Sequence, residues 1–307
     1  MGYLFLIIAL FAGVTKGFCG KKTSFAITTT SDSMVMNVLR MGVCILIGFF
    51  FIVFSGELGS LKLESALLFP ALLSGVASAA FVVSWLLSVR TGAYMMVEVF
   101  LLLGTIVPIV LCRVFFAEAV SVWQIAGIVL LLISVFIMCT YNMDVKGKIK
   151  PLAFLLLLLC GLASGIADFS QKLFVKAATD KSVLAFNFYT YVFAALCLLC
   201  IYLVFRIAER KRNGEARSPL AVVKPIWIYV LVMAICLFAN SFFKTQAAQY
   251  LNAASLYPLN QGCAVVLSLL MSAIIFKEKI NAKCIVGICI SFVALLMINL
   301  DMSAIFG

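Results

Sequence analysis

Hydrophobic residues along this chain form long runs that charged residues do not interrupt. Ten runs of 14 to 32 residues contain no Asp, Glu, Lys or Arg: residues 1–15, 41–56, 65–89, 99–112, 119–143, 151–167, 182–205, 225–243, 245–276 and 284–300. A bilayer core about 30 Å thick is crossed by roughly 20 mainly apolar helical residues. Barrel strands alternate inward and outward over about ten residues, whereas these runs are longer and continuously apolar. The pattern predicts an all-α polytopic membrane protein with ten transmembrane helices.

Composition argues against a soluble or nucleic-acid-binding protein. Hydrophobic residues make up 65% of the chain and charged residues 11%, against about 45 to 50% and about 25% in soluble domains. The net charge of +11 comes from Lys and Arg in loops and at helix ends, with no basic face of interleaved aromatics. We therefore expect the lipid bilayer as a partner and no nucleic acid.

Candidate chemistry is sparse, which argues against an enzyme. The chain has no His and so lacks the usual general base and the commonest metal ligand. Its eleven Cys lie mostly inside apolar runs, and the CxxC pair of Cys197 and Cys200 has no second pair to complete a metal site. No HExxH, GxSxG or paired intramembrane Asp is present. We expect no catalytic residue, no metal and no cofactor.

The second half of the chain repeats the first. The segment FFAEAVSVWQIAGI, residues 115–128, aligns without a gap on IFKEKINAKCIVGI, residues 275–288, at a shift of 160 positions. Both segments contain Phe-x-Glu and a Gly nine residues after the Glu. The repeat predicts two five-helix domains, residues 1–150 and 151–307. An odd number of spans in each copy places the second copy upside down, around a pseudo-two-fold axis in the membrane plane.

Paired glycines occur at matching places in the first helix of each half. At a shift of 148 positions, Gly13 and Gly17 align with Gly161 and Gly165. A GxxxG spacing lets helix backbones approach closely in lipid, where packing must replace the hydrophobic drive. We predict a packing role for both pairs, with contact between their backbone and a substrate as the alternative.

These features resemble ten-helix, EamA-like members of the drug/metabolite transporter superfamily. The resemblance is carried by the doubled Phe-x-Glu motif, the Gly-rich first helix of each half and the run Leu-Tyr-Pro-Leu-Asn-Gln at residues 256–261, and it covers essentially the whole chain. It implies export or exchange of a small organic solute. Small multidrug transporters of this superfamily carry an acidic residue in their first helix, whereas this chain has Lys16 there. A uniporter or an exchanger is therefore open.

The two glutamates of the repeated motif have a structural interpretation. Glu118 and Glu278 end a helix shortly before Ser121 and Asn281, which are both good N-cap residues for the helix that follows. We expect both glutamates to close a turn rather than to take part in transport.

Several ionisable residues fall inside or next to predicted spans, where a charged group costs about 3 kcal/mol or more. Asp168 precedes Lys172 by four residues, a spacing that predicts an ion pair on one helix. Lys16 and Lys244 lie near helix ends and can extend to the interface, and Arg40 is expected to open its span. For these residues we favour structural roles.

Glu98 is the strongest functional candidate. The charge-free run that follows it is too short to cross a bilayer, so the fourth span must begin near Ala93 and include Glu98. Eight residues of helix beyond Arg90 place Glu98 about 12 Å along the axis. We expect Glu98 to exchange a proton or to pair with a cationic group on the solute.

Glu98 has polar counterparts in the second half. At the shift of 160 it corresponds to Pro258, and Pro loosens the preceding turn and frees carbonyl groups that a ligand can satisfy. We predict a substrate or proton site in a central cavity between the halves, although packing is the alternative role for its aromatic residues. The predicted members of the site are Glu98, Asn260, Gln261, Pro258, Tyr257 and Tyr94. The secondary candidates are Lys16, Asp168, Asn240 and Lys244.

The sequence thus predicts a transporter that moves a small organic solute by alternating access. We expect a monomer or homodimer in the plasma membrane, with protons as the candidate coupling ion. A non-transporting membrane receptor or assembly factor is the alternative, but the loops between spans are short for such a role. An intramembrane enzyme is a further alternative that lacks a clustered nucleophile and base.

Two indications of membrane orientation conflict. One side of the predicted bundle receives 15 Lys and Arg residues and the other receives 6. The positive-inside rule therefore places the richer side in the cytoplasm and both termini outside. The family resemblance implies the reverse, with both termini in the cytoplasm.

Overall fold

The computed structural model of the chain is helical throughout the part that it describes, which is residues 1–23, 29–62, 64–90, 94–146, 151–213, 223–275 and 282–299. These residues contain no β-strand. The helices are α1 (Gly2–Thr23), α2 (Thr30–Phe54), α3 (Ser65–Arg90), α4 (Tyr94–Gly104), α5 (Ile106–Phe116), α6 (Val122–Lys146), α7 (Pro151–Ala177), α8 (Val183–Asn213), α10 (Trp227–Ala248), α11 (Ala253–Ile275) and α12 (Ala282–Asn299), with a short 3-10 helix η2 (Leu58–Leu61).

Counted as membrane crossings, the described helices give the ten predicted spans. α4 and α5 form one interrupted span, because Pro108 has no N–H to donate to the Gly104 carbonyl and its ring conflicts with that carbonyl. The interruption falls at Thr105, whose hydroxyl donates to the Leu102 carbonyl at 2.7 Å. Six helices, α1, α2, α3, α7, α8 and α10, are long and apolar enough within their described residues to cross a membrane singly. The all-α polytopic fold is confirmed.

The second span begins well before its charge-free run. α2 starts at Thr30, because Thr29 and Asp32 form a capping box. The Thr29 hydroxyl accepts from the Asp32 N–H at 3.1 Å, and the Asp32 carboxylate accepts from the Thr29 N–H at 3.0 Å. The expectation that Arg40 opens this span is therefore wrong, since Arg40 lies ten residues inside α2.

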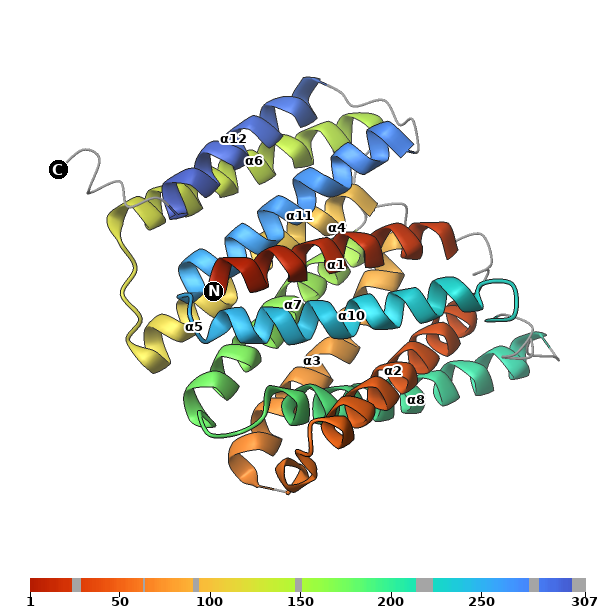
Figure 1. Cartoon of the computed structure of the whole chain (residues 1–307). Coiled ribbons are helices and arrows are strands. Elements are labelled where there is room, and N and C mark those ends of the chain that lie inside the picture. The colour runs from red at the N-terminus through yellow and green to blue at the C-terminus, as the bar shows by residue number, and fades with distance from the viewer. Residues whose placement is uncertain are drawn as a thin grey trace.

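The helices lie side by side in one bundle (Figure 1). α6 packs on α12 along one edge, and α2 packs on α8 along the opposite edge. Between these edges α1 packs on α10, α3 packs on α7 and α8, and α4 and α5 pack on α7. α1 begins and α12 ends at the same end of the bundle, as an even number of spans requires.

The helix contacts correspond when the two halves are exchanged. We match α1 with α7, α2 with α8, α3 with α10, the α4–α5 span with α11, and α6 with α12. Exchanging the matched helices turns the α3–α7 contact into the α10–α1 contact and leaves the α2–α8 and α6–α12 contacts unchanged. α1 and α7 run in opposite directions, since a methyl group added at Gly2, at the start of α1, would lie 3.0 Å from the Leu251 side chain, and Lys172, near the end of α7, donates to the Leu251 carbonyl. Inverted repeats produce this arrangement. The domain boundary at residue 150 stays a prediction.

The glycine pair of α7 lies close to the backbone of another helix, whereas within the described residues the matching glycine pair of α1 does not. A methyl group added at Gly161 or Gly165 of α7 would clash with the backbone of the interrupted span, where Gly104 lies. The predicted packing role of this glycine pair is confirmed. In α1, a methyl group at Gly13 would lie 3.0 Å from the nearest described atom, and at Gly17 no atom of the described structure lies within 4 Å.

The loop between α5 and α6 is held by backbone and side-chain caps. The Glu118 N–H donates to the Cys112 carbonyl at 3.4 Å and so closes the end of α5. Ser121 and Gln124 form a reciprocal cap at the start of α6, with hydrogen bonds of 3.0 and 3.1 Å. These contacts confirm the structural roles predicted for Glu118 and Ser121. Their counterparts outside the described residues are Glu278 and Asn281.

At the end of the bundle where α7 finishes, two loops meet outside the spans. Lys181 pairs with Glu64 at 2.7 Å and with Asp180 at 3.3 Å. Hydrogen bonds to Glu64 and Asp180 raise the pKa of Lys181, which lies outside the spans. Ser182 donates to the Glu57 carboxylate at 2.5 Å. The loops that follow α2 and α7 are thereby joined.

Candidate functional site

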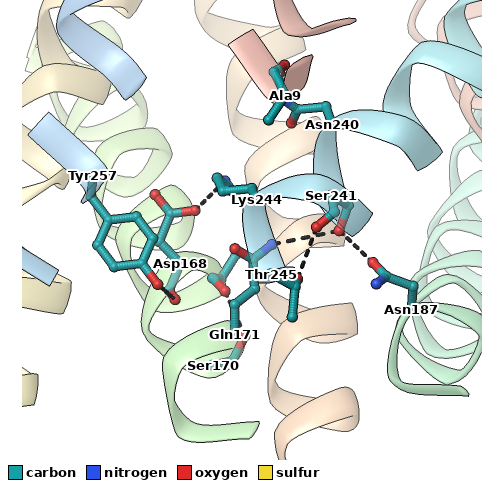
Figure 2. A network of polar contacts seen from close by, with 11 residues as sticks. Ala9, Asp168, Ser170, Gln171, Asn187, Asn240, Ser241, Lys244, Thr245 and Tyr257 are labelled. Carbon is teal, nitrogen blue, oxygen red and sulfur yellow. Dashed lines mark hydrogen bonds and ion pairs between the residues drawn. The ribbon is translucent and has the colours of Figure 1, made fainter. Parts of the chain in front are cut away.

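Polar side chains from α7, α8 and α10 meet in the interior of the second half, and we call this group the interior polar network (Figure 2). Lys244 donates to the Asp168 carboxylate at 2.5 Å. Ser241 donates to the Asn187 amide oxygen at 2.6 Å, and the Gln171 amide lies 3.5 Å from the Ser241 hydroxyl. Because lipid offers no hydrogen bonds, these partners satisfy polar groups that would otherwise be costly to bury.

Helical spacing explains why these side chains converge. Asp168 and Gln171 are three residues apart on α7, and Ser241 and Lys244 are three residues apart on α10. Residues at this spacing lie on one face of a helix. Each helix therefore presents one short polar strip, and the two strips face each other (Figure 2).

Asp168 pairs with Lys244 and not with Lys172. Both side chains of the Asp168–Lys244 pair are 13% exposed. The predicted ion pair between Asp168 and Lys172 is wrong, and Lys244 does not extend to the interface as expected. The sequence spacing favoured a pair within α7, but tertiary packing supplies each residue with a partner from another element.

Lys172 instead belongs to a structural cluster at the end of the bundle. Its ammonium group lies 3.2 Å from the Glu118 carboxylate and donates to the carbonyls of Ala248 and Leu251 at 2.9 and 2.6 Å. Glu118 also accepts the Ala253 N–H at 2.9 Å. Lys172 thus satisfies free carbonyls where α10 ends, and Glu118 satisfies a free N–H where α11 begins.

Tyr257 links α11 to the interior polar network. Its hydroxyl donates to the backbone carbonyl of Asp168 at 2.6 Å, and its side chain is 1% exposed. Pro258 follows within α11, which continues past it without a break. No break therefore occurs at Pro258, whereas the fourth span is interrupted at Thr105, three residues before Pro108.

Asn260 and Asn240 lie on different helices and differ in the hydrogen bonds that their amide groups make. Asn240 of α10 donates to the Ala9 carbonyl of α1 at 2.6 Å (Figure 2). The Asn260 amide oxygen on α11 is buried and has no hydrogen-bond partner among the described residues. Gln261 beside it is half-buried. Asn260 is therefore the member of the predicted site with unused hydrogen-bonding capacity in the described structure.

Glu98 and Tyr94 lie in α4, so the fourth span begins where predicted and includes Glu98. Their side chains fall outside the described part of the structure. The described contacts bring together Asp168, Lys244 and Tyr257, and none of them joins Asn260 to this group.

Arg40 is an interior residue that the sequence interpretation placed wrongly. Ten residues of helix from Thr30 put it about 15 Å along α2, and it is 9% exposed. Its electrostatic neighbours are Cys44 and Tyr191. Lys16 of α1 also acts on Cys44, so two cationic side chains converge on this region between α1, α2 and α8.

A periodic signal could have located this polar face. Ser33, Asn37, Arg40 and Cys44 recur at intervals of four, three and four residues, and all four are buried. This spacing marks one face of a helix that continues upstream of the charge-free run. Counting charged residues alone hid it, because Asp32 and Arg40 interrupt the run.

A cavity of about 370 Å³ lies at the end of the bundle rather than at its centre. Its polar lining includes Lys172, Lys176, Thr179, Gln249 and Asn252. No group of three or more Cys, Asp or Glu within the described part of the chain could hold a metal ion.

These features define an integral membrane protein of ten spans with a charged, hydrogen-bonded interior. The model of the EamA-like transporter family matches residues 151–300, and the second half of the chain is therefore EamA-like. This match confirms the predicted resemblance to the drug/metabolite transporter superfamily.

A solved crystal structure of another protein has the same fold. It matches with a TM-score of 0.74 over 100% of this chain and 99% of that chain, at 12% sequence identity. At this identity the likeness shows the fold alone. No curated protein matches the chain.

Proposed function

We propose that the protein transports a small organic solute by alternating access between two inverted halves, residues 1–150 and 151–307. The family match supports transport, since EamA-like proteins form a transporter family. The opposite directions of α1 and α7 support the inverted arrangement. Alternating access follows from such symmetry when the two halves adopt unequal conformations that they can exchange.

The observation that carries this proposal is the unequal packing of the paired glycines. Gly161 and Gly165 lie against the interrupted span, whereas the space beside Gly17 is open in the described structure. In the opposite conformation, α1 closes onto α11 as α7 now closes onto α4 and α5. The α1 glycines would then approach the region of Asn260, whose amide oxygen has no described partner now.

The predicted site residues take roles in this cycle. Glu98 exchanges a proton or pairs with a cationic group on the solute, while Asn260 and Gln261 contact the solute from α11. Pro258 and Tyr257 shape the start of α11, and Tyr94 lines the same region from α4. Lys16, Asp168, Asn240 and Lys244 set the polarity of the interior.

Ligand screening followed by a transport assay tests the proposal. Thermal-shift screening of the purified protein against amino acids, nucleosides, sugars, vitamins and cationic drugs finds a ligand, because binding to the folded state raises the melting temperature. The ligand is then measured in counterflow across proteoliposomes. We expect accumulation with the wild type and loss of accumulation with Glu98→Gln.

A matched control is Glu57→Gln, which removes a carboxylate from an exposed loop. This variant should transport normally. Normal transport by Glu98→Gln would remove Glu98 from the mechanism. A ligand that binds but does not cross the membrane would contradict transport and favour a receptor or assembly factor.

A further inference from the structure

Arg40 carries a charge that the described protein does not neutralise. Its side chain is 9% exposed and lies about 15 Å along α2, far from both ends of the helix. Its Nε atom is buried without a hydrogen-bond partner in the described structure. None of the ion pairs between described residues includes Arg40, and its neighbours Cys44 and Tyr191 are not carboxylates.

Two other largely buried cations do have carboxylate partners. Lys244 pairs with Asp168 at 2.5 Å, and Lys172 pairs with Glu118 at 3.2 Å. Arg cannot shed its proton to escape the cost of burial, whereas a buried Lys can. An unpaired guanidinium in the membrane interior is therefore a functional signal, because such groups are costly and usually face a partner or a pathway.

A second cationic side chain lies near Arg40 and adds to the positive charge of this region. Lys16 of α1 acts on the same Cys44 thiol as Arg40, so a second cation lies in this region. The Cys44 thiol beside Arg40 donates to the Ala234 carbonyl at 3.3 Å. The region thus combines two cations from α1 and α2.

We propose that Arg40 binds an anionic group, a carboxylate or phosphate ester, of the solute that the protein carries, with Lys16 adding electrostatic attraction. A guanidinium presents parallel N–H donors that match two oxygens of a carboxylate or phosphate, which an ammonium group cannot do. The claim that this anionic group belongs to a transported solute rests on the proposed transport function, but anion binding at Arg40 can be tested without transport.

The first test needs no ligand. We would measure the thermal unfolding of the purified full-length protein and of Arg40→Met and Lys244→Met. Removing an unpaired buried charge should raise the melting temperature, whereas Lys244→Met leaves Asp168 unpaired and should lower it. If Arg40→Met lowers the melting temperature as Lys244→Met does, Arg40 is a structural partner and the proposal is wrong.

The second test uses pairs of probes in which a neutral amide or hydroxyl group replaces the anionic group. Benzoate, succinate and glycerol 3-phosphate are compared with benzamide, succinamide and glycerol in thermal shift on the wild type. We expect at least one anion to raise the melting temperature while its neutral counterpart does not. Equal shifts for the members of every pair, or no shift with any anion, would overturn the proposal.

Variants then assign the anion effect to Arg40. Arg40→Gln should weaken anion binding by roughly 30-fold or more, as loss of a buried charge partner does, and Arg40→Lys should retain part of it. Lys181→Gln, which removes a cation from an exposed loop, is the matched control and should bind as the wild type does. Unchanged binding by Arg40→Gln would refute the assignment. An anion that binds through Arg40 but is not transported would leave this site standing and refute the transport function instead.

Discussion

Some buried charges in this protein are neutralised by a described residue of another helix, and others are not. Asp168 and Lys244 face each other from α7 and α10, and each is 13% exposed. Arg40 is 9% exposed and has no carboxylate partner among the described residues. A buried ion pair is costly to break because the partner that is left keeps its desolvation cost. These two arrangements therefore predict opposite responses to substitution.

The Asp168–Lys244 pair is expected to be strongly coupled. Lys244→Gln should destabilise the protein by about 3 kcal/mol, because it leaves the Asp168 carboxylate buried without its counter-ion. The double variant Asp168→Asn/Lys244→Gln should recover part of that loss. Thermal unfolding of the two single variants and the double variant measures the coupling. Additive losses would mean that the two groups do not stabilise each other.

The paired glycines give a prediction that separates stability from transport. Gly165→Ala should cost about 1 to 3 kcal/mol, because a methyl group there meets the backbone of Gly104. Gly17→Ala should leave stability unchanged or raise it by up to about 1 kcal/mol, since the site is open and Ala favours helix.

Gly17→Ala should nevertheless slow transport if α1 closes onto α11 during the cycle. Counterflow in proteoliposomes and thermal unfolding, measured on the same preparations of both variants, provide the check. Full transport activity in Gly17→Ala would show that α1 never makes the contact that α7 makes now.

At the scale of elements, caps and breaks decide where helices begin and end. The capping box of Thr29 and Asp32 starts α2 well before its apolar run, and Pro108 interrupts the fourth span. Both signals are local and visible in the sequence. The interruption was foreseeable from Pro108, but Pro258 carries the same local signal and α11 continues past it. Local sequence marks where a break is possible, and packing decides whether it occurs.

The cluster of Glu118 and Lys172 is expected to stabilise three elements together. Glu118→Gln should destabilise the protein by about 3 kcal/mol, because Lys172 would lose its buried counter-ion. Gln124→Ala, which removes a cap from the same loop without touching this ion pair, should cost only about 1 kcal/mol. Thermal unfolding of both variants in detergent tests the difference, and equal losses would argue against a special role for the carboxylate.

At the scale of the whole molecule, the sequence predicted the number and type of spans well. Charge-free runs report burial in lipid directly, so ten spans and the depth of Asp168 and Lys16 within their helices followed from counting. Pairing between helices did not follow, because the partner of Asp168 is 76 residues away. No single helix pattern indicates that Lys244, rather than the nearer Lys172, would face this carboxylate. The side chain of Glu98 lies outside the described residues, so its role stays a prediction.

Membrane orientation is a further property of the whole molecule, and a fusion decides between the two predictions. The described helices place the start of α1 and the end of α12 at the same end of the bundle. A fluorescent protein fused to the C-terminus matures only in the cytoplasm. Fluorescence would support the orientation implied by the family resemblance, and a dark but membrane-inserted fusion would support the positive-inside rule. An alkaline phosphatase fusion at the same position should give the opposite signal.

The cluster of Glu118 and Lys172 ties the loop after α5 to α7 and to the turn between α10 and α11, all at one end of the bundle. This cluster resists separation of the elements that it joins. If the halves rock during transport, this cluster keeps its end of the bundle closed now and must separate when the halves exchange conformations, whereas the opposite membrane face, where α1 ends, is free of it. In this conformation the solute would then enter or leave from that face.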